Sequence, residues 1–376
     1  MSVLFRPLRW GAVACVTLAL AGCGSGPKKP DPKPLEPIAS PIAGRVVWQQ
    51  SLDKVTFPLH VASQDDVFAL ATSNGTVLAV QADTGTSLWR AEVGEALGAG
   101  VGFDGRSAAV VTLKGDVVVV QPTGVVWRRP VGVQVATAPL VAGERVFVLG
   151  SDRSVHAYDV QDGRKLWALQ RQGDPLTLLQ PGVLRPFGNT LVVGQGPRMV
   201  GLDSLKGSVT WETSVASPRG TNEIERLADL VGPAARVGEF VCARSFQSAI
   251  GCVNAARGAL AWSKNFGGTL GLAADADQVY AADAADRIQT WKTTTGLPLW
   301  TSDALANHGL TAPAIAGPLL IFGDARGMVH VLSRDDGRAL LRLATDGSPI
   351  VATPTVSGTT VLVVTRKGGL FALRPE

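Results

Sequence analysis

The chain has 376 residues, of which 43 are Gly and only 18% are charged, and its formal net charge is +4. Charge this weak, and dispersed along the chain, excludes the basic stripe of a nucleic-acid-binding protein, so we expect no nucleic-acid partner. Many glycines with few charged residues are typical of a β-protein with many tight turns rather than of a helical one.

The N-terminal segment has the features of a lipoprotein signal. Arg6 and Arg9 precede an apolar run, residues 11–22, that is too short to span a bilayer comfortably. The run closes with Leu-Ala-Gly-Cys at residues 20–23, which resembles a bacterial lipobox. We therefore expect residues 1–22 to be removed and Cys23 to be lipidated, which leaves a net charge near +2 (4 − 2). The alternative is an ordinary secretory signal with a chance cysteine.

Residues 23–44 combine the lipidated Cys23 with a proline-rich tether. Residue 24 is Gly and not Asp, and by the sorting rule of enteric-type lipoproteins this implies transfer to the outer membrane, with the folded domain facing the periplasm. Several acyl chains would hold the protein there, as its membrane contact. Such a tether packs no core, favours polyproline II and reaches about 60 Å at about 3.1 Å per residue. Its prolines are Pro27, Pro30, Pro32, Pro34, Pro37 and Pro41.

From residue 45 onward a unit of about 40 residues recurs, and each unit ends in a Gly turn followed by an aromatic anchor. The gaps between anchors are 41, 38, 40, 44, 51, 38 and 41 residues. The turn glycine precedes its anchor by four residues, or by three at Gly124. An aromatic side chain at a fixed repeat position indicates packing between repeats. The anchors are Trp48, Trp89, Trp127, Trp167, Trp211, Trp262, Trp300 and Leu341, which replaces Trp in the last unit.

Each unit also contains short apolar runs separated by turns. Residues 67–70 and 77–80 flank Ser-Asn-Gly and read as a hairpin, and residues 146–149 with 155–158 repeat it. With the apolar stretch before each hairpin, every unit supplies about four strands. Residues 45–376 are therefore predicted to be an all-β, eight-bladed β-propeller with four antiparallel strands per blade. Because the chain starts with one final-type strand near Trp48, we expect that strand to join the last blade and close the ring.

The repeat at residues 155–167, Val-His-Ala-Tyr-Asp-Val-Gln-Asp-Gly-Arg-Lys-Leu-Trp, resembles the quinoprotein-type (PQQ-like) propeller repeat. The lipobox, the proline-rich tether and eight such repeats together resemble the BamB family over essentially the whole chain. Members of that family are propeller lipoprotein subunits of the BAM complex, which folds β-barrels into the outer membrane.

Two short segments carry a more specific resemblance. Residues 221–229, Thr-Asn-Glu-Ile-Glu-Arg-Leu-Ala-Asp, resemble a family loop that typically reads Thr-Glu-Ile-Asp-Arg-Leu-Ser-Asp, and they lie in the longest gap between anchors. Residues 176–179, Leu-Thr-Leu-Leu, stand where the family has Leu-Ser-Leu-Arg. The chain departs from the family at Leu179, which replaces an arginine, and at Val231, which replaces an acidic residue.

The resemblance implies a non-enzymatic scaffold that aids the folding and insertion of outer-membrane proteins. In the family these two loops contact the POTRA domains of BamA, and other BAM subunits and unfolded client chains are further partners. Blade edges could receive extended clients by strand addition. An apolar centre with a charged rim is a usual interface pattern; from the residues alone, the alternative is buried leucines and merely solvated charges. The candidate partner-binding residues are Leu176, Leu178, Glu223, Glu225, Arg226 and Asp229.

Two other functions stay open from the sequence. The repeat also suits a quinoprotein dehydrogenase that uses PQQ and calcium, but such enzymes carry a vicinal Cys pair, which this chain lacks. The four His, at positions 60, 156, 308 and 330, are expected in different blades without ligand spacing. Without a nucleophile, P-loop or dinucleotide motif, we predict no catalytic, metal or cofactor-binding residues and no cofactor. The third possibility is a sugar- or peptidoglycan-binding propeller lipoprotein.

Two cysteines lie in the folded part of the chain. Cys242 and Cys252 flank a hairpin, residues 243–251, and their spacing can place them opposite each other. The periplasm permits disulfides. We expect a structural cross-strand bridge and not a redox-active one, because the spacing is not Cys-x-x-Cys.

Overall fold

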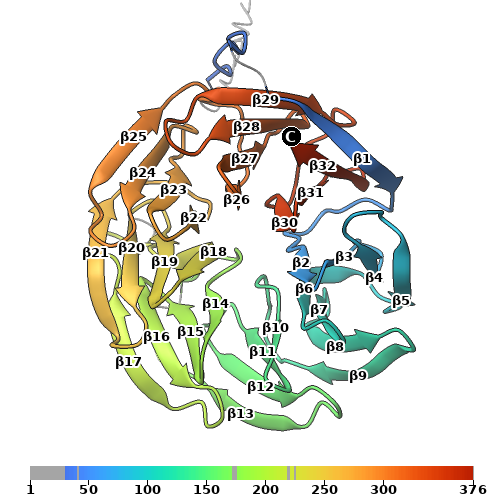
Figure 1. The fold of residues 1–376 in the computed structure, drawn as a ribbon. Helices are drawn as coiled ribbons and strands as arrows, with labels where there is room; N and C mark the ends of the chain where they lie inside the picture. Colours follow the sequence, from blue (N-terminus) through green and yellow to red (C-terminus); the bar gives the residue numbers. More distant parts are fainter. Residues whose placement is uncertain (1–29, 40–41, 172–175, 218–220, 224–225, 376) are drawn as a thin grey trace, which may run out of the picture. The chain divides into compact units, whose positions relative to one another are not determined.

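The computed structural model describes residues 30–39, 42–171, 176–217, 221–223 and 226–375. It separates into residues 1–31 and a compact unit, residues 32–376. The compact unit is built of eight four-stranded antiparallel sheets set around a ring (Figure 1). The predicted eight-bladed, all-β propeller is confirmed. Within the described residues no helix is long and apolar enough to cross a membrane.

Blades 1 to 7 follow the chain, and in each the strands run in order from the ring axis to the rim (Figure 1). The strands of blades 1 to 3 are β2 (Ala62–Gln64), β3 (Val67–Ala71), β4 (Thr76–Gln81) and β5 (Ser87–Glu92); β6 (Leu97–Phe103), β7 (Ala108–Thr112), β8 (Asp116–Gln121) and β9 (Gly124–Pro130); and β10 (Leu140–Ala142), β11 (Arg145–Leu149), β12 (Val155–Asp159) and β13 (Lys165–Leu169). Those of blades 4 and 5 are β14 (Leu184–Phe187), β15 (Thr190–Gln195), β16 (Arg198–Asp203) and β17 (Val209–Ser214); and β18 (Leu230–Val237), β19 (Phe240–Ser245), β20 (Ala249–Asn254) and β21 (Ala259–Asn265). Those of blades 6 and 7 are β22 (Ala273–Ala274), β23 (Gln278–Ala282), β24 (Ile288–Lys292) and β25 (Pro298–Ser302); and β26 (Ala314–Ala316), β27 (Leu319–Gly323), β28 (Met328–Ser333) and β29 (Ala339–Ala344).

Blade 8 is made from both ends of the compact unit. Its strands are β30 (Thr355–Ser357), β31 (Thr360–Val364), β32 (Gly369–Pro375) and β1 (Gly44–Ser51). β1 pairs antiparallel with β32 from Gly44 opposite Pro375 to Ser51 opposite Gly369. The predicted closure of the ring by the N-terminal strand is therefore confirmed, and the inner edge of β1 is paired.

The core lies between the blades rather than within any one of them. The second and third strands, such as β7 and β8, are buried along nearly their whole length, whereas the outer strand β9 is mostly exposed or half-buried. One apolar cluster runs through blades 8, 1 and 2 and includes Leu362, Phe68 and Val110. Continuous Val- and Ala-rich runs suit these positions because both sheet faces are covered by neighbouring blades.

The anchor tryptophans join each blade to the next one. The Nε1 of Trp127 donates a hydrogen bond to the carbonyl of Val160, 2.8 Å away, and a Cβ placed on Gly163 would lie 2.6 Å from Cδ2 of Trp127. The same arrangement joins Trp262 to the turn of Gly296. The anchor therefore needs a residue without a side chain in the next blade, which is why Gly and Trp recur together. Trp48, Trp167 and Trp300 meet Gly85, Gly207 and Gly337 in the same way, each with an Nε1 hydrogen bond to the next blade. Trp211 also lies against the turn glycine of the next blade, Gly258, through its Cβ and Cγ.

Two units depart from this rule. Gly124, which stands one residue closer to its anchor, has nothing within 4 Å of a placed Cβ, so no aromatic ring covers it. In blade 7 the apolar Leu341 takes the tryptophan position, and its Cδ2 lies against Gly44 at the start of β1. The smaller anchor therefore sits at the junction where the ring is closed.

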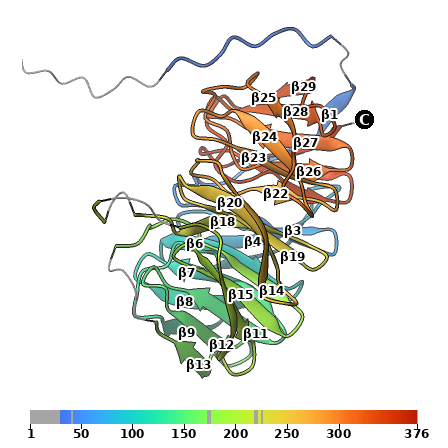
Figure 2. The same ribbon diagram turned by 90° about the vertical axis from the view of Figure 1, so that its left-hand side faces the viewer.

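The tether was expected to pack no core, but from residue 32 onward it docks on the propeller. The Lys33 amide donates to the Ala306 carbonyl at 3.0 Å, and Lys33 Nζ pairs with Asp303 Oδ1 at 2.8 Å. Leu35 packs on the apolar cluster of blades 6 and 7. Arg342 donates to the Glu36 carbonyl at 2.6 Å. A few apolar and cationic side chains within a Pro-rich segment suffice to dock it; we name residues 32–39 the strap (Figure 2).

The two cysteines lie opposite each other in the register of β19 and β20, and the structure joins them in a disulfide. Both residues are fully buried in the apolar cluster between blades 5 and 6. The bridge therefore ties the two central strands of blade 5 and contributes apolar surface to the core.

Gly163→Ala tests the stacking between blades. The replacement has to adopt φ near +71° and also meets the Trp127 ring, whereas Gly143→Ala has φ +58° and nothing within 4 Å. Both variants carry a left-handed backbone cost of about 1–2 kcal/mol. We expect Gly163→Ala to lose about 1–3 kcal/mol more because of overpacking. Urea unfolding at equilibrium measures the difference, and equal losses in the two variants would contradict the stacking role.

Thiol titration tests the bridge. The unfolded, non-reduced mature chain is expected to show no free thiol from Cys242 and Cys252, and two after reduction. The double Ser variant is expected to lose about 2–4 kcal/mol of unfolding free energy. Two reactive thiols in the chain before reduction would refute the bridge.

Candidate functional site

The long connections of the ring gather on one face. In an antiparallel blade, the turn between the second and third strands lies on the same face as the connections between blades. The two longest connections are residues 170–183, between β13 and β14, and residues 215–229, between β17 and β18. Their described residues lie beside each other on this face, next to blades 3 to 5 (Figure 2). The two family-like segments therefore lie next to each other, although some 40 residues separate them in the sequence.

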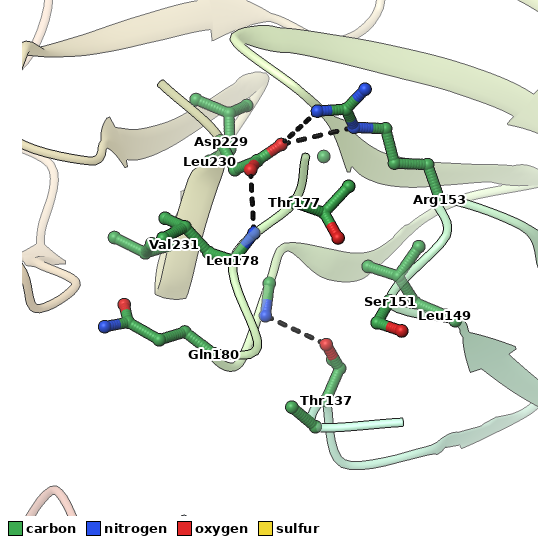
Figure 3. A pocket seen from close by; sticks show the side chains of 14 residues that line it. Thr137, Leu149, Ser151, Arg153, Thr177, Leu178, Gln180, Asp229, Leu230 and Val231 are labelled. Carbon is green, nitrogen blue, oxygen red and sulfur yellow. Dashed lines mark hydrogen bonds and ion pairs between the residues drawn. The ribbon is translucent and has the colours of Figure 1, made fainter. Parts of the chain in front are cut away.

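Asp229 connects the two loops. Its Oδ2 accepts a hydrogen bond from the Leu178 amide at 3.1 Å, and its Oδ1 accepts from Nη2 of Arg153 at 3.0 Å (Figure 3). The side chains of Arg153 and Asp229 are 18% and 14% exposed, so this ion pair is largely shielded from water. Charge-assisted hydrogen bonds of this kind are stronger than neutral ones. Asp229 therefore holds the loop of Leu178 against blade 5.

The backbone around Asp229 is fixed by its neighbours. Ala228 and Leu230 are buried on either side of it. Ser245 donates through Oγ to the Ala228 carbonyl at 2.7 Å, and the Phe246 amide donates to the Asp229 carbonyl at 2.9 Å. The carboxylate thus projects from a rigid strand start, which sets its direction toward Arg153.

Arg153 comes from the turn between β11 and β12 in blade 3. Its φ of +66° belongs to the left-handed region, and Asp152 caps the turn through the Ser154 amide at 2.9 Å. Besides Asp229, its guanidinium reaches the Leu176 carbonyl at 3.4 Å. One arginine therefore contacts both loops. Arg153 could not be singled out from the sequence, because no repeat position or motif distinguishes it.

A cavity of about 490 Å³ opens beside this clamp. Its walls combine cationic, acidic and apolar side chains. Glu212 on β17 pairs with Arg171 at 2.8 Å and with Arg198, and hydrogen bonding from Arg198 is the largest influence that holds the pKa of the Glu212 carboxyl below its ordinary value. Leu176, Glu223 and Arg226 lie at its exposed edge. The lining also includes Leu227 and Gln195.

A smaller cavity of about 40 Å³ lies beneath the loops, between blades 3 and 5 (Figure 3). Thr137 Oγ1 accepts from the Gly182 amide at 2.9 Å and fixes the loop's end. Val231, which stands at the family's acidic position, is buried in its wall. A cavity of this size holds a water molecule rather than a ligand.

The predicted partner-binding residues fall into three groups. Leu176, Glu223 and Arg226 are exposed at the mouth of the large cavity. Leu178 is half-buried and lines the small one. Asp229 was expected as a rim charge, and this is wrong because its carboxylate is enclosed by Arg153 and the Leu178 amide. Glu225 and Cys23 lie outside the described residues.

One expectation about histidines is also wrong. His308 and His330 were placed in separate blades, but the structure brings them together with Asp324 in a buried group. His60 and His156 lie elsewhere; burial lowers the pKa of both rings below the ordinary value. Among the described residues this is the one group of three or more His, Cys, Asp or Glu with metal-ligand spacing.

The fold and the loop-built surface define a propeller of the PQQ-like repeat class with an elaborated face. A family model described as outer membrane protein assembly factor BamB matches residues 39–93, 73–302 and 293–376. A BamB from Burkholderia pseudomallei is 34% identical over 100% of both chains, and one from Bordetella pertussis is 32% identical over 98% of this chain and 97% of the relative. This chain belongs to the BamB family.

Solved structures agree on the fold. The crystal structure of BamB from Moraxella catarrhalis superposes with a TM-score of 0.80 at 22% identity, covering 88% of this chain and 100% of that one. A quinohemoprotein alcohol dehydrogenase from Comamonas testosteroni has a TM-score of 0.67 at 14% identity, covering 88% of this chain and 76% of that one. At such identities the likeness concerns the architecture alone.

Asp229→Ala tests the clamp between the loops. Losing the acceptor is expected to speed amide hydrogen exchange at Leu178 by about tenfold, the equivalent of about 1.4 kcal/mol for a lost charge-assisted bond. Glu223→Ala is the control because that side chain is exposed. Unchanged exchange at Leu178 in Asp229→Ala, measured by mass spectrometry or NMR, would contradict the clamp.

Proposed function

We propose that this protein is a non-enzymatic scaffold subunit of the BAM complex and that its loop-bearing face, residues 176–180 and 221–229 over blades 3 to 5, binds the POTRA domains of BamA. The relatives that match over the whole chain are named outer membrane protein assembly factors. The observation that carries the proposal is the Asp229 clamp, which presents two distant loops as one surface.

The chemistry of this surface suits a protein partner. Leu176 and Leu179 are exposed apolar side chains, and 59% of Leu179 is accessible. Glu223 and Arg226 add exposed charges of both signs beside them. Exposed apolar residues next to mixed charges provide a desolvated centre with a polar rim. A surface that is already fixed by the clamp also loses less entropy on binding than a mobile one.

The departure from the family at Leu179 fits this interpretation. Where the family loop has an arginine, this chain presents an exposed apolar side chain. Arg171 and Arg198 line the large cavity, but both pair with Glu212 and so contribute less charge to a partner. We infer that this chain relies on Arg226 and on apolar contact at the interface.

Client binding is a second part of the proposal. The outer strands β5, β21 and β25 run along the rim of the ring, and each carries at least one exposed apolar residue: Leu88, Leu260, and Leu297 with Leu299 at the start of β25. A rim strand offers unpaired backbone groups to an extended chain, and adjacent apolar side chains add contact area. Unfolded outer-membrane proteins contain such alternating strands.

The location follows from the N-terminal signal. We propose that Cys23 carries the lipid and holds the propeller at the periplasmic face of the outer membrane. Because the strap docks on the ring from residue 32 onward, the stretch between Cys23 and the strap can span at most about 25–30 Å at about 3.1 Å per residue. That reach is half of what the sequence suggested, so the ring stays close to the membrane and to other membrane-bound subunits.

Charge reversal tests the partner surface. Arg226→Glu, and separately Leu176→Ala with Leu178→Ala, are expected to weaken binding to isolated BamA POTRA domains by about 10- to 100-fold, equal to about 1.4–2.7 kcal/mol. Calorimetry or surface plasmon resonance measures the change.

Arg257→Glu is the matched control, since Arg257 is an exposed arginine in the turn between β20 and β21 on the opposite face of the ring. Circular dichroism confirms that each variant is folded. Undiminished POTRA binding by folded Arg226→Glu and by the double leucine variant would sink this assignment, and so would an equal loss in Arg257→Glu.

A further inference from the structure

The buried group in blade 7 consists of His308, Asp324 and His330. His308 lies in the connection from β25 to β26, Asp324 follows β27, and His330 is on β28. All three are at most 4% exposed. Asp324 Oδ2 lies 3.0 Å from Nε2 of His330 and 3.5 Å from Nδ1 of His308. One carboxylate oxygen therefore faces two imidazole nitrogens in a space that bulk water does not reach.

The proton on His308 is assigned by its other contact. Nε2 of His308 lies 2.9 Å from the Lys33 carbonyl oxygen, which can only accept, so Nε2 carries the hydrogen and donates. In the neutral ring, Nδ1 then presents a lone pair toward Asp324 Oδ2. Nδ1 has no hydrogen-bond partner despite its burial. Two electron-rich atoms face each other, which is unfavourable unless a positive charge lies between or on them.

The second oxygen of Asp324 is already occupied. Oδ1 accepts from the amides of Arg326 and Met328, each at 2.8 Å. These bonds close the turn after β27 and fix the carboxylate in its plane. Oδ2 is thereby held toward the two rings, in the way that ligating carboxylates are oriented by hydrogen bonds of their own.

The separations match those of a tetrahedral metal site. Zinc binds imidazole nitrogen at about 2.0–2.1 Å and carboxylate oxygen at about 2.0–2.2 Å, which places neighbouring ligand atoms about 3.3–3.5 Å apart. The observed 3.0 and 3.5 Å lie around that value, and all three ligand atoms fall within 4.8 Å of one another. The bond from His308 to the Lys33 carbonyl is the outer contact that zinc-binding histidines usually make.

We propose that His308 Nδ1, Asp324 Oδ2 and His330 Nε2 form a binding site for a divalent transition metal of the zinc type. The ion would supply the positive charge that the paired nitrogen and oxygen atoms require. The donor set of two imidazoles and one carboxylate suits zinc and its neighbours rather than calcium or magnesium, which prefer oxygen ligands. This inference does not depend on the proposed function.

The site would also secure the strap. His308 binds the Lys33 carbonyl, while the Lys33 amide and side chain bind Ala306 and Asp303. Leu35 packs on the cluster that contains Leu305 and Phe322. Fixing the His308 ring by a metal ion therefore fixes the segment that leads toward the membrane anchor. The proposed role is structural, at the point where the tether meets the ring.

Blade 3 offers a matched control. His156 on β12 lies opposite Val148 as His330 lies opposite Phe322, so the two histidines occupy the same place in their blades. Gly150 stands at the place of Asp324, and the nearby carboxylate in blade 3 is that of Asp152, two residues further along the turn. Ser154 Oγ stands between this carboxylate and the imidazole, 2.9 Å from His156 Nε2 and 2.6 Å from Asp152 Oδ1. In the blade 3 group a hydroxyl thus links the imidazole to the carboxylate, and among the described residues no second imidazole stands there at metal-ligand spacing, so it should not bind metal.

The test uses the full mature chain without a histidine tag, stripped with a chelator and dialysed. Zinc alone is titrated by calorimetry, and cobalt alone by visible absorption, which reports tetrahedral coordination. We expect one ion per chain, and slower amide exchange at Lys33 when the ion is bound. His330→Gln, His308→Gln and Asp324→Asn are expected to weaken binding by at least about 100-fold, and His156→Gln to leave it unchanged.

Asp324→Asn keeps the acceptor for the Arg326 and Met328 amides, so it guards against a fold defect in the histidine variants. Two results would overturn the proposal. One is failure of the unaltered chain to take up zinc or cobalt, which would leave the group as a carboxylate hydrogen-bonded to an imidazole. The other is uptake that persists in folded Asp324→Asn and His330→Gln, which would place the ion elsewhere.

Discussion

The propeller depends on one recurring contact, in which a tryptophan of one blade packs on the turn glycine of the next; six of the eight blade junctions have it. The indole side chain is held in two ways. It covers the glycine, and its Nε1 donates a hydrogen bond to a carbonyl of the same turn, as Trp127 does to Val160. Both partners belong to the repeat, so the contact recurs wherever one unit keeps the tryptophan and the next keeps a turn glycine four residues before its own anchor. Because the indole combines a large apolar ring with one N–H donor, it fixes both the distance and the orientation between the two blades that it joins. Adjacent sheets are therefore held at a constant angle, and a constant angle is what closes a ring of eight.

Because the propeller is fixed by contacts between its blades, the connections between the blades can form a binding surface. Short connections need only pass from rim to axis, whereas residues 170–183 and 215–229 are longer than that path requires. Surplus chain on a surface is ordered only if something binds it. Here the binding is internal, because Asp229 and Arg153 use two blades to hold two loops. These contacts attach the loops to the blades, so the surface that we propose as the BamA interface is held by the propeller.

The sequence predicted whatever is periodic or matched in register. Blade number, ring closure and the facing positions of Cys242 and Cys252 follow from spacing alone. Contacts between elements distant in the chain were not predictable in the same way. Arg153 sits in a turn like seven others, and only its side chain, reaching across a blade boundary, gives it a role. His308 and His330 likewise meet because a connection folds back on the next blade. Such contacts depend on how the blades are arranged in space, and the spacing of the repeats along the sequence does not specify that arrangement.

If the chain is anchored through Cys23, as we propose, the strap links that attachment to the closure of the ring. β1 closes blade 8, and the same segment leads directly toward the tether, so tension on the anchor would act on the pairing of β1 with β32. The strap directs that tension to blade 7 and to the connection before it. Lys33 and Leu35 bind the connection before blade 7, and Glu36 binds Arg342 on its outer strand. Each of these contacts lies between the anchor and β1, so a pull has to break them first. A proline-rich linker with a few docking residues therefore protects the one junction of the ring that no covalent turn secures.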